Sequence, residues 1–200
     1  GYAGSYILLH LRLPRMATAL FAGAAMALSG SQMQSIFRNP LADPHIMGIS
    51  SGAALGAALA TMHTGAALAG MSIAISASIG AAGAAGIILY ASGRFRNASI
   101  LLIFGVMLGF IITAIVSILQ FSSDAESLKI FYSWSAGSFS TTTWSDIITL
   151  AIAVLIGTAL AIAGRKGLDI ILFGDEFALM AGAKVGNIRL TVLLSCCIMT

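Results

Sequence analysis

The chain alternates long apolar runs with short polar connections. The runs contain no Asp, Glu, Lys, Arg or His, and most approach the ~20 apolar residues that a helix needs to cross a bilayer. A last run begins at Leu190 and has 11 residues, too few to span unless the natural chain continues. The other runs predict membrane-spanning helices over residues 17–36, 46–62, 66–91, 99–121 and 147–163.

A polar turn separates the first two predicted spans. Pro40 and Pro44 cannot sit inside a helix without breaking it. Arg38 and Asp43 are unfavourable in hydrocarbon, where one central charge costs about 2.5–3.5 kcal/mol. We therefore place this turn at a membrane face.

Small residues recur at short spacing inside the predicted spans. Gly52 and Gly56, Gly105 and Gly109, and the glycines of residues 80–86 each place small groups on one stripe of a helix. Such stripes are typical of membrane helices that pack closely, and we assign them no chemistry.

The composition agrees with a membrane protein. Hydrophobic residues make up 58% of the 200 positions and charged residues only 8%, and the mean hydropathy is +0.99. A soluble domain carries about 25% charged residues. We expect an all-α protein, a polytopic transmembrane helical bundle that forms one domain over residues 1–200. The cations form no basic patch with interleaved aromatic residues, so we expect no nucleic-acid binding.

The cations are shared unequally between the two sets of connections. Seven of the ten fall on one side, which the positive-inside rule places in the cytoplasm. The segment before the first span is then outside, yet residues 1–10 show no signal peptide. We therefore expect an internal fragment of a larger protein, truncated at both ends. The seven are Arg38, Arg94, Arg96, Arg165, Lys166, Lys184 and Arg189, and the others are Arg12, Arg15 and Lys129.

The predicted spans lack the charged groups that proton- or sodium-driven transporters usually carry at mid-depth. The energy for any transport is therefore expected to come from outside the membrane part. Thr113, Ser117 and Gln120 share one helix face through their i, i+4, i+7 spacing, and Gln34 lies at the end of the first span. These residues either make interhelical hydrogen bonds or line a wet pathway for a large polar solute.

The sequence shows no catalytic or metal-binding pattern. His10, His45 and His63 lie at separate turns, without a second ligand at metal spacing. It also has no nucleophile–base pair and no phosphate-binding Gly-Lys loop. We expect no enzyme activity, no metal and no cofactor, so an ATPase would be a separate chain.

Three segments in order carry a family resemblance. They are Leu11–Arg15 before a span with Gly30 and Gln34, the stretch FRNPLADP from Phe37 followed by GISSGA from Gly48, and Gly174-Asp175-Glu176 with Gly182. Together they resemble the permease subunits of bacterial ABC importers for iron–siderophore, haem and cobalamin, the FecCD-like family.

The resemblance covers essentially the whole chain and implies the type II ABC importer permease fold. Ten spans per subunit are implied, of which this sequence would hold the second to sixth and the start of the seventh. The implied protein is a multi-pass homodimer in the bacterial inner membrane, surrounded by lipid. Its implied partners are a cytoplasmic ATPase dimer and a periplasmic substrate-binding protein. The residues do not choose among haem, siderophore and cobalamin as cargo.

The basic stretch 164–189 is expected to be a cytoplasmic loop, and by resemblance it is the coupling loop that receives the ATPase. Asp175 or Glu176 could cap a short helix there. Phe177, Leu179 and Met180 would give this helix an apolar face that fills a groove of the ATPase. An amphipathic helix lying on the bilayer is the alternative. The predicted coupling residues are Gly174, the possible caps Asp175 and Glu176, the apolar Phe177, Leu179 and Met180, and Ala178 and Gly182.

Two further roles concern the periplasmic side. By resemblance, Arg12 and Arg15 would dock acidic residues of the binding protein, and the alternative is that they only snorkel to lipid phosphates. The aromatic segment 128–139 is too short and too polar to cross, which suggests an interfacial helix. By resemblance it lies beside the substrate entrance, and Trp134 is its candidate pathway residue.

The resemblance also assigns a cytoplasmic gate, framed by Asn39 and Leu41 after the first span and by Ala98 and Ser99 at the start of the fourth. Plain helix capping explains these positions equally well.

The main functional alternative is a secondary transporter or channel that works without an ATPase. The coupling pattern and the uncharged spans favour the importer. A membrane-embedded enzyme would need a charged or metal-binding cluster in a span, and the sequence has none.

Overall fold

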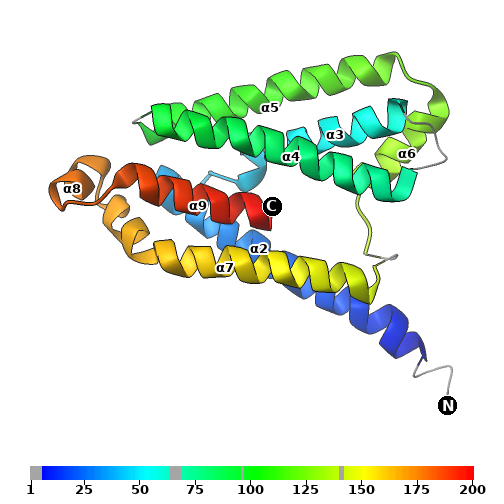
Figure 1. Cartoon of the computed structure of the whole chain (residues 1–200), viewed down its shortest axis with the longest axis horizontal. Coiled ribbons are helices and arrows are strands. Elements are labelled where there is room, and N and C mark those ends of the chain that lie inside the picture. The colour runs from blue at the N-terminus through cyan, green and yellow to red at the C-terminus, as the bar shows by residue number, and fades with distance from the viewer. Residues whose placement is uncertain (1–5, 64–68, 96, 140–141) are drawn as a thin grey trace.

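The computed structural model describes residues 6–63, 69–95, 97–139 and 142–200. Every regular element in these residues is helical, as the sequence predicts (Figure 1). The elements are η1 (Leu8–Arg12), α2 (Leu13–Phe37), η2 (Pro44–Met47), α3 (Ile49–His63), α4 (Ala69–Arg94), α5 (Ala98–Phe121), α6 (Ala125–Ser135), α7 (Trp144–Leu172), α8 (Asp175–Met180) and α9 (Val185–Met199).

The helix bounds differ from several predicted spans. The span 46–62 is divided, because Gly48 adopts a left-handed conformation (φ 80°) that separates η2 from α3. The span 147–163 is too short, since α7 continues to Leu172. The start of the span 66–91 lies outside the described residues, and α9 begins at Val185, before the last apolar run.

Among the described residues, three helices are long and apolar enough to cross a membrane: Ile73–Arg94 of α4, α5 and α7. The helices α3 and α9 are apolar but shorter. The 25-residue α2 contains the predicted span 17–36 but is less apolar. Ser29, Ser31, Gln32 and Gln34 near its end lower its hydropathy.

The helices pack in two groups around one core (Figure 1). Helix α3 contacts α4, α5 and α6, while α2 contacts α7 and α9, and α4 touches α9 across the boundary. The largest buried cluster draws on both groups. It includes Met33 of α2, Met47 of η2, Ile88 of α4, Leu101 of α5 and Leu193 of α9.

The helices α3 and α4 approach each other backbone to backbone. A Cβ atom built at Gly52 would lie 2.6 Å from the carbonyl oxygen of Gly80, and one at Gly56 would clash with the carbonyl oxygen of Ser76. The absence of a side chain allows this contact, which confirms the predicted close packing. Close packing does not account for Gly83 and Gly86, where a Cβ would meet nothing within 4 Å.

The second predicted glycine pair, Gly105 and Gly109, packs against the turn before α3. A Cβ atom at Gly105 would lie 3.3 Å from the Cα of Met47, and Gly109 lies against Gly48 at the same Cβ–Cα distance. The pair on α5 therefore fixes η2 and the start of α3.

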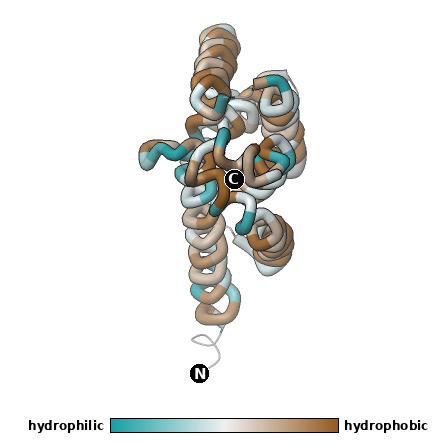
Figure 2. Tube along the Cα trace, turned by 90° about the vertical axis from the view of Figure 1, so that its left-hand side faces the viewer, coloured by the Kyte–Doolittle hydropathy of each residue, from teal (hydrophilic) through white to brown (hydrophobic). Residues whose placement is uncertain are grey.

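The connections gather at two opposite ends of the molecule (Figure 1). One end holds α8, the α2–η2 connection and the α4–α5 turn, and the other holds η1, α6 and the start of α7. Figure 2 views the molecule from the α8 end and shows mostly apolar helices, with hydrophilic colour limited to short stretches. The α8 end contains the segments that carry the larger set of cations, of which Arg96 lies outside the described residues.

Helix α6 begins and ends earlier than the predicted segment 128–139. Asp124 is its N-cap and accepts a hydrogen bond from the backbone N–H of Ser127 at 3.0 Å. Soon after the helix, Gly137 adopts φ 66°, which favours glycine. The buried Phe131 fixes α6 to the cluster beneath α3 and α4.

Candidate functional site

The most distinctive local structure is α8, the short helix between α7 and α9. The sequence predicts a loop over 164–189, but the structure has the last turns of α7, then α8, then the first turn of α9. The basic residues after Ala163 do not end α7, because lysine and arginine are favourable in a helix and no proline follows them. The chain instead turns at Gly174, where φ is 112°.

A second glycine ends α8. Gly182 adopts φ 78°, its N–H donates to Leu179 O, and the N–H of Ala183 donates to Ala178 O. This pair of bonds is the Schellman motif, which satisfies the last carbonyls of a helix. Two glycines with positive φ, Gly174 and Gly182, therefore set the position of α8.

Helix α8 has a buried and an exposed face. Ala178, one of the predicted coupling residues, is fully buried in a cluster with Ile171 and Val185 and so anchors the helix. The large apolar residues point outward, with Phe177 50%, Leu179 52% and Met180 83% exposed. Together with Phe173, which is 77% exposed, they form the apolar α8 surface.

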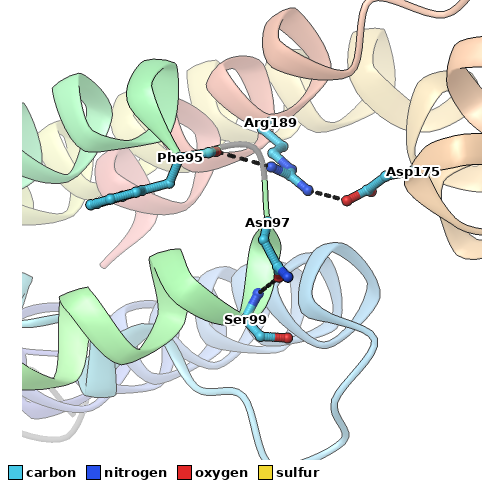
Figure 3. Close-up of polar contacts among 5 residues, drawn as sticks. All are labelled: Phe95, Asn97, Ser99, Asp175 and Arg189. Atoms are coloured by element: carbon cyan, nitrogen blue, oxygen red, sulfur yellow. Dashed lines mark hydrogen bonds and ion pairs between the residues drawn. The ribbon is translucent and has the colours of Figure 1, made fainter.

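The two acidic residues of α8 do not cap it in the predicted way. Gly174 is the N-cap position and makes no side-chain cap. Asp175 instead reaches α9, where its Oδ2 lies 2.5 Å from Nη2 of Arg189 (Figure 3). Glu176 is exposed.

Arg189 is the functional candidate that the sequence analysis missed. The sequence predicts a loop cation at this position, but Arg189 lies on α9 and is only 2% exposed. Its Nη1 donates to the carbonyl oxygen of Phe95, at the start of the α4–α5 turn, over 3.4 Å (Figure 3). Its helical spacing to the buried Val185, Val192 and Cys196 was the available signal.

A groove of about 730 Å³ lies beside α8. It brings together three segments that are distant in sequence: Arg38 of the α2–η2 connection, Asn97 of the α4–α5 turn, and the residues of α8. Arg38 is the left-handed cap of α2 (φ 49°), and a Cβ atom built at Gly174 would lie 3.3 Å from its Nη1.

The predicted gate residues lie near this groove but make ordinary turn and cap contacts. Asn39 Oδ1 accepts from the N–H of Leu41 at 2.9 Å, and the N–H of Ser99 donates to Asn97 Oδ1 at 2.8 Å (Figure 3). Ala98 is buried in the main core, so it lines no opening in this conformation, whereas Leu41 is 79% exposed. A gating role stays a prediction.

The predicted pathway residues are spread over three elements. On α5, Thr113 donates to Gly109 O and Ser117 donates to Thr113 O within the helix, and Thr113 Oγ1 also lies 3.3 Å from Ser51 Oγ of α3. Gln120 is half-buried on the same helix and Gln34 is exposed on α2.

Trp134 of α6 packs beside Phe131, with ring centroids 6.5 Å apart. It also lines a groove with small residues of α4 and the end of α9. These positions leave the pathway role a prediction.

The predicted docking arginines lie at the end opposite α8. Arg12 closes η1, Arg15 lies in the first turn of α2, and both are exposed. Trp144 Nε1 donates to Leu9 O at 3.2 Å and ties the start of α7 to this region. Docking to a binding protein stays a prediction.

In the part of the chain that the structure describes, no three His, Cys, Asp or Glu side chains are grouped so that they could hold a metal ion. His45 Nδ1 lies 2.6 Å from Ser50 Oγ, and His10 packs against the ring of Tyr6. The side chain of His63 lies outside the described part.

The profile of the FecCD transport family matches residues 2–200. The chain belongs to this family. It is thus an all-helical, multi-pass membrane protein, in agreement with the sequence analysis.

Characterised relatives of this FecCD chain include permeases with different named cargoes. It is 35% identical over 194 residues to the hemin transport system permease HmuU of Yersinia pestis, covering 94% of this chain and 58% of HmuU. It is 33% identical over 190 residues to the molybdate import permease MolB of Haemophilus influenzae, covering 94% of this chain and 56% of MolB. The chain spans about half the length of these curated relatives.

A solved structure supports the same fold. An ABC transporter described as metal-chelate type, in an inward-facing conformation, matches 100% of this chain with a TM-score of 0.86 and 30% identity. The match covers 64% of that transporter chain.

Proposed function

We propose that this FecCD-family chain acts as a permease subunit of an ATP-driven importer in the bacterial inner membrane. The observation that carries the proposal is the apolar α8 surface, which lies at one end of a membrane bundle between two glycines with positive φ. Similar proteins include the hemin permease HmuU and the vitamin B12 permease BtuC of Klebsiella pneumoniae.

The proposed occupant of the α8 surface is a separate ATPase chain. Large apolar side chains on a short, fixed helix fit a groove of a partner, the helix-in-groove mode of recognition. The described sequence contains no phosphate-binding Gly-Lys loop, so this chain would contribute no ATP hydrolysis and bind no cofactor. The buried Ala178 and the pairing of Asp175 with Arg189 hold the surface against the membrane part.

The proposed cargo is a metal chelate: haem, an iron–siderophore or cobalamin. The groove beside α8 is also lined by Arg38 and Asn97, which adjoin the predicted gate residues in sequence, so a movement of α8 would occur next to both predicted gate segments. A periplasmic binding protein would deliver the cargo at the opposite end, where Arg12 and Arg15 are exposed. A second permease copy and a second ATPase complete the proposed assembly.

The proposal is tested with the full-length permease co-expressed with its ATPase. Phe177→Ser combined with Met180→Ser removes two exposed anchors, and each buried anchor of an interface is worth about 2 kcal/mol or more. We expect the ATPase to be lost from the purified complex. The matched control is Phe121→Ser, 95% exposed at the end of α5, which should leave the complex intact. Full co-purification with the double variant would contradict the proposal.

A further inference from the structure

Arg189 connects three segments of the chain through one guanidinium group. Its Nη2 bonds Asp175, the first residue of α8, and its Nη1 bonds the carbonyl oxygen of Phe95, where α4 ends (Figure 3). The residue itself lies in the first turns of α9. The contacts reach 14 and 94 residues back along the chain.

A charged arginine at this buried position carries a desolvation cost. Arg189 is 2% exposed, and its partner Asp175 is 23% exposed, so both charges have left most of their water. A buried ion pair often stabilises a fold no better than apolar residues of the same size. A planar guanidinium, however, can hold two acceptors in fixed directions, which apolar residues and lysine cannot do. The geometry therefore indicates a role in orientation.

The guanidinium supplies a polar link between α8 and the α4–α5 turn. Helix α8 packs on α7 and α9, and α9 packs on α4. The α4–α5 turn then leads into α5 through Asn97, whose side chain caps the helix at Ser99. Phe95 is held from the other side by its ring contact with Phe104 at 5.6 Å. A displacement of Asp175 would thus be passed through Arg189 to Phe95, two residues before the N-cap of α5.

We propose that Arg189 is a positioning residue that transmits movement of α8 to the α4–α5 turn. This inference rests on the proposed function, because it needs an ATPase that moves α8. Arg189 is 2% exposed and is not among the residues that line the groove beside α8, so its proposed role is to position other residues. Its effect is to make the orientation of the first turn of α5 depend on the orientation of α8.

The test uses the assembled full-length transporter with its ATPase in proteoliposomes. Amide hydrogen exchange of residues 97–101 is measured with and without ATP and vanadate. The variant Arg189→Lys keeps the charge but loses the two-directional fork. The matched control is Arg165→Lys, the same substitution at an exposed position of α7.

In the wild type and in Arg165→Lys, trapping with vanadate should change exchange at residues 97–101. In Arg189→Lys the response should fall about two- to thirty-fold with the ATPase still bound, the range of couplings carried by packed networks. A merely structural role would lower thermal stability and leave the response unchanged. If Arg189→Lys fails to fold, Asp175→Asn replaces it, since the amide keeps the shape and one acceptor oxygen.

A wild-type exchange response in folded Arg189→Lys or in folded Asp175→Asn would overturn the inference. A wild-type complex whose exchange at residues 97–101 does not respond to vanadate would overturn it as well. Failure of the wild-type chain to assemble with an ATPase would instead contradict the proposed function, and that result appears before any variant is made.

Discussion

Two helix contacts in this molecule are built in opposite ways. The contact between α3 and α4 depends on missing side chains, since Gly52, Gly56 and Gly80 let the backbones meet. The contact between α8 and α9 combines the buried Ala178 and Val185 with an ion pair between Asp175 and Arg189, which are 14 residues apart in sequence. The first contact is made largely by backbone atoms, whereas an ion pair between two side chains helps to hold the second. The difference suggests a rigid body at α3–α4 and an adjustable joint at α8.

The largest effect is expected from filling the glycine contact. Gly56→Val places a branched side chain against the carbonyl oxygen of Ser76, where only backbone movement could relieve the clash. We expect a loss of about 3 kcal/mol in the free energy of unfolding, the upper part of the range for overpacking. Thermal unfolding in detergent measures it. Gly83→Ala is the control, because nothing lies within 4 Å, and an equal loss there would contradict the account.

Removing one charge of the Asp175–Arg189 ion pair should have the next largest effect on the free energy of unfolding. Asp175→Ala leaves the guanidinium of Arg189 buried without its carboxylate. Breaking a fully buried pair costs ~3–5 kcal/mol, and we expect about 2 kcal/mol here because Asp175 is 23% exposed. Asp169→Ala, at an exposed position of α7, should change stability little. Equal unfolding midpoints for the two variants would show that the pair does not hold α8.

A smaller effect is expected at the end of α8. Gly182→Ala forces a side chain into a left-handed conformation (φ 78°), which costs about 1 kcal/mol. Gly186→Ala on α9, with nothing within 4 Å, should be neutral or stabilising. Limited proteolysis between α7 and α9 reports the local loosening, and faster cleavage in the Gly186 variant alone would reverse the expected order.

The smallest effect is expected for the pH dependence of α6, at the end of the molecule opposite α8. The backbone N–H of Ser127 donates to Asp124 and lowers the pKa of that carboxyl below its ordinary 3.8. The stabilisation of α6 is therefore complete above this value and is lost as the pH falls through the lower pKa of the folded state. Trp134 fluorescence, followed from about pH 5 to about pH 2, should show this loss in the wild type but not in Asp124→Asn. An identical titration in both would exclude the cap as its cause.

The sequence could predict the rigid part of this fold because its signals are local. Apolar length predicts the helices, and glycine spacing predicts the close approach at Gly52, Gly56 and Gly80, although not at Gly83 and Gly86. The limits of the helices were harder to predict, because α7 runs through Arg165 and Lys166 without a break. Charged residues mark a membrane boundary, but they do not end a helix.

The joint at α8 could be predicted only in part. The pattern of Gly174 and Gly182 located the short helix, and Phe177, Leu179 and Met180 are exposed as expected. The role of Asp175 was missed because its partner is set by the tertiary fold, and a cation counted for membrane orientation was in fact buried. Contacts between residues of different elements produce no periodic pattern in the sequence. The contact of Arg189 with Phe95, 94 residues away, could therefore be seen only in the structure.

The most direct test of the account asks which side of the membrane the α8 surface faces. A cysteine is introduced by Met180→Cys, at a position that is 83% exposed, into the full-length permease in its native membrane. A membrane-impermeant maleimide should label it in inverted vesicles that lack the ATPase, should label it much less in inverted vesicles that carry the bound ATPase, and should not label it in intact cells. Labelling from the cell exterior, or no protection by the ATPase, would contradict the central claim that α8 receives the ATPase.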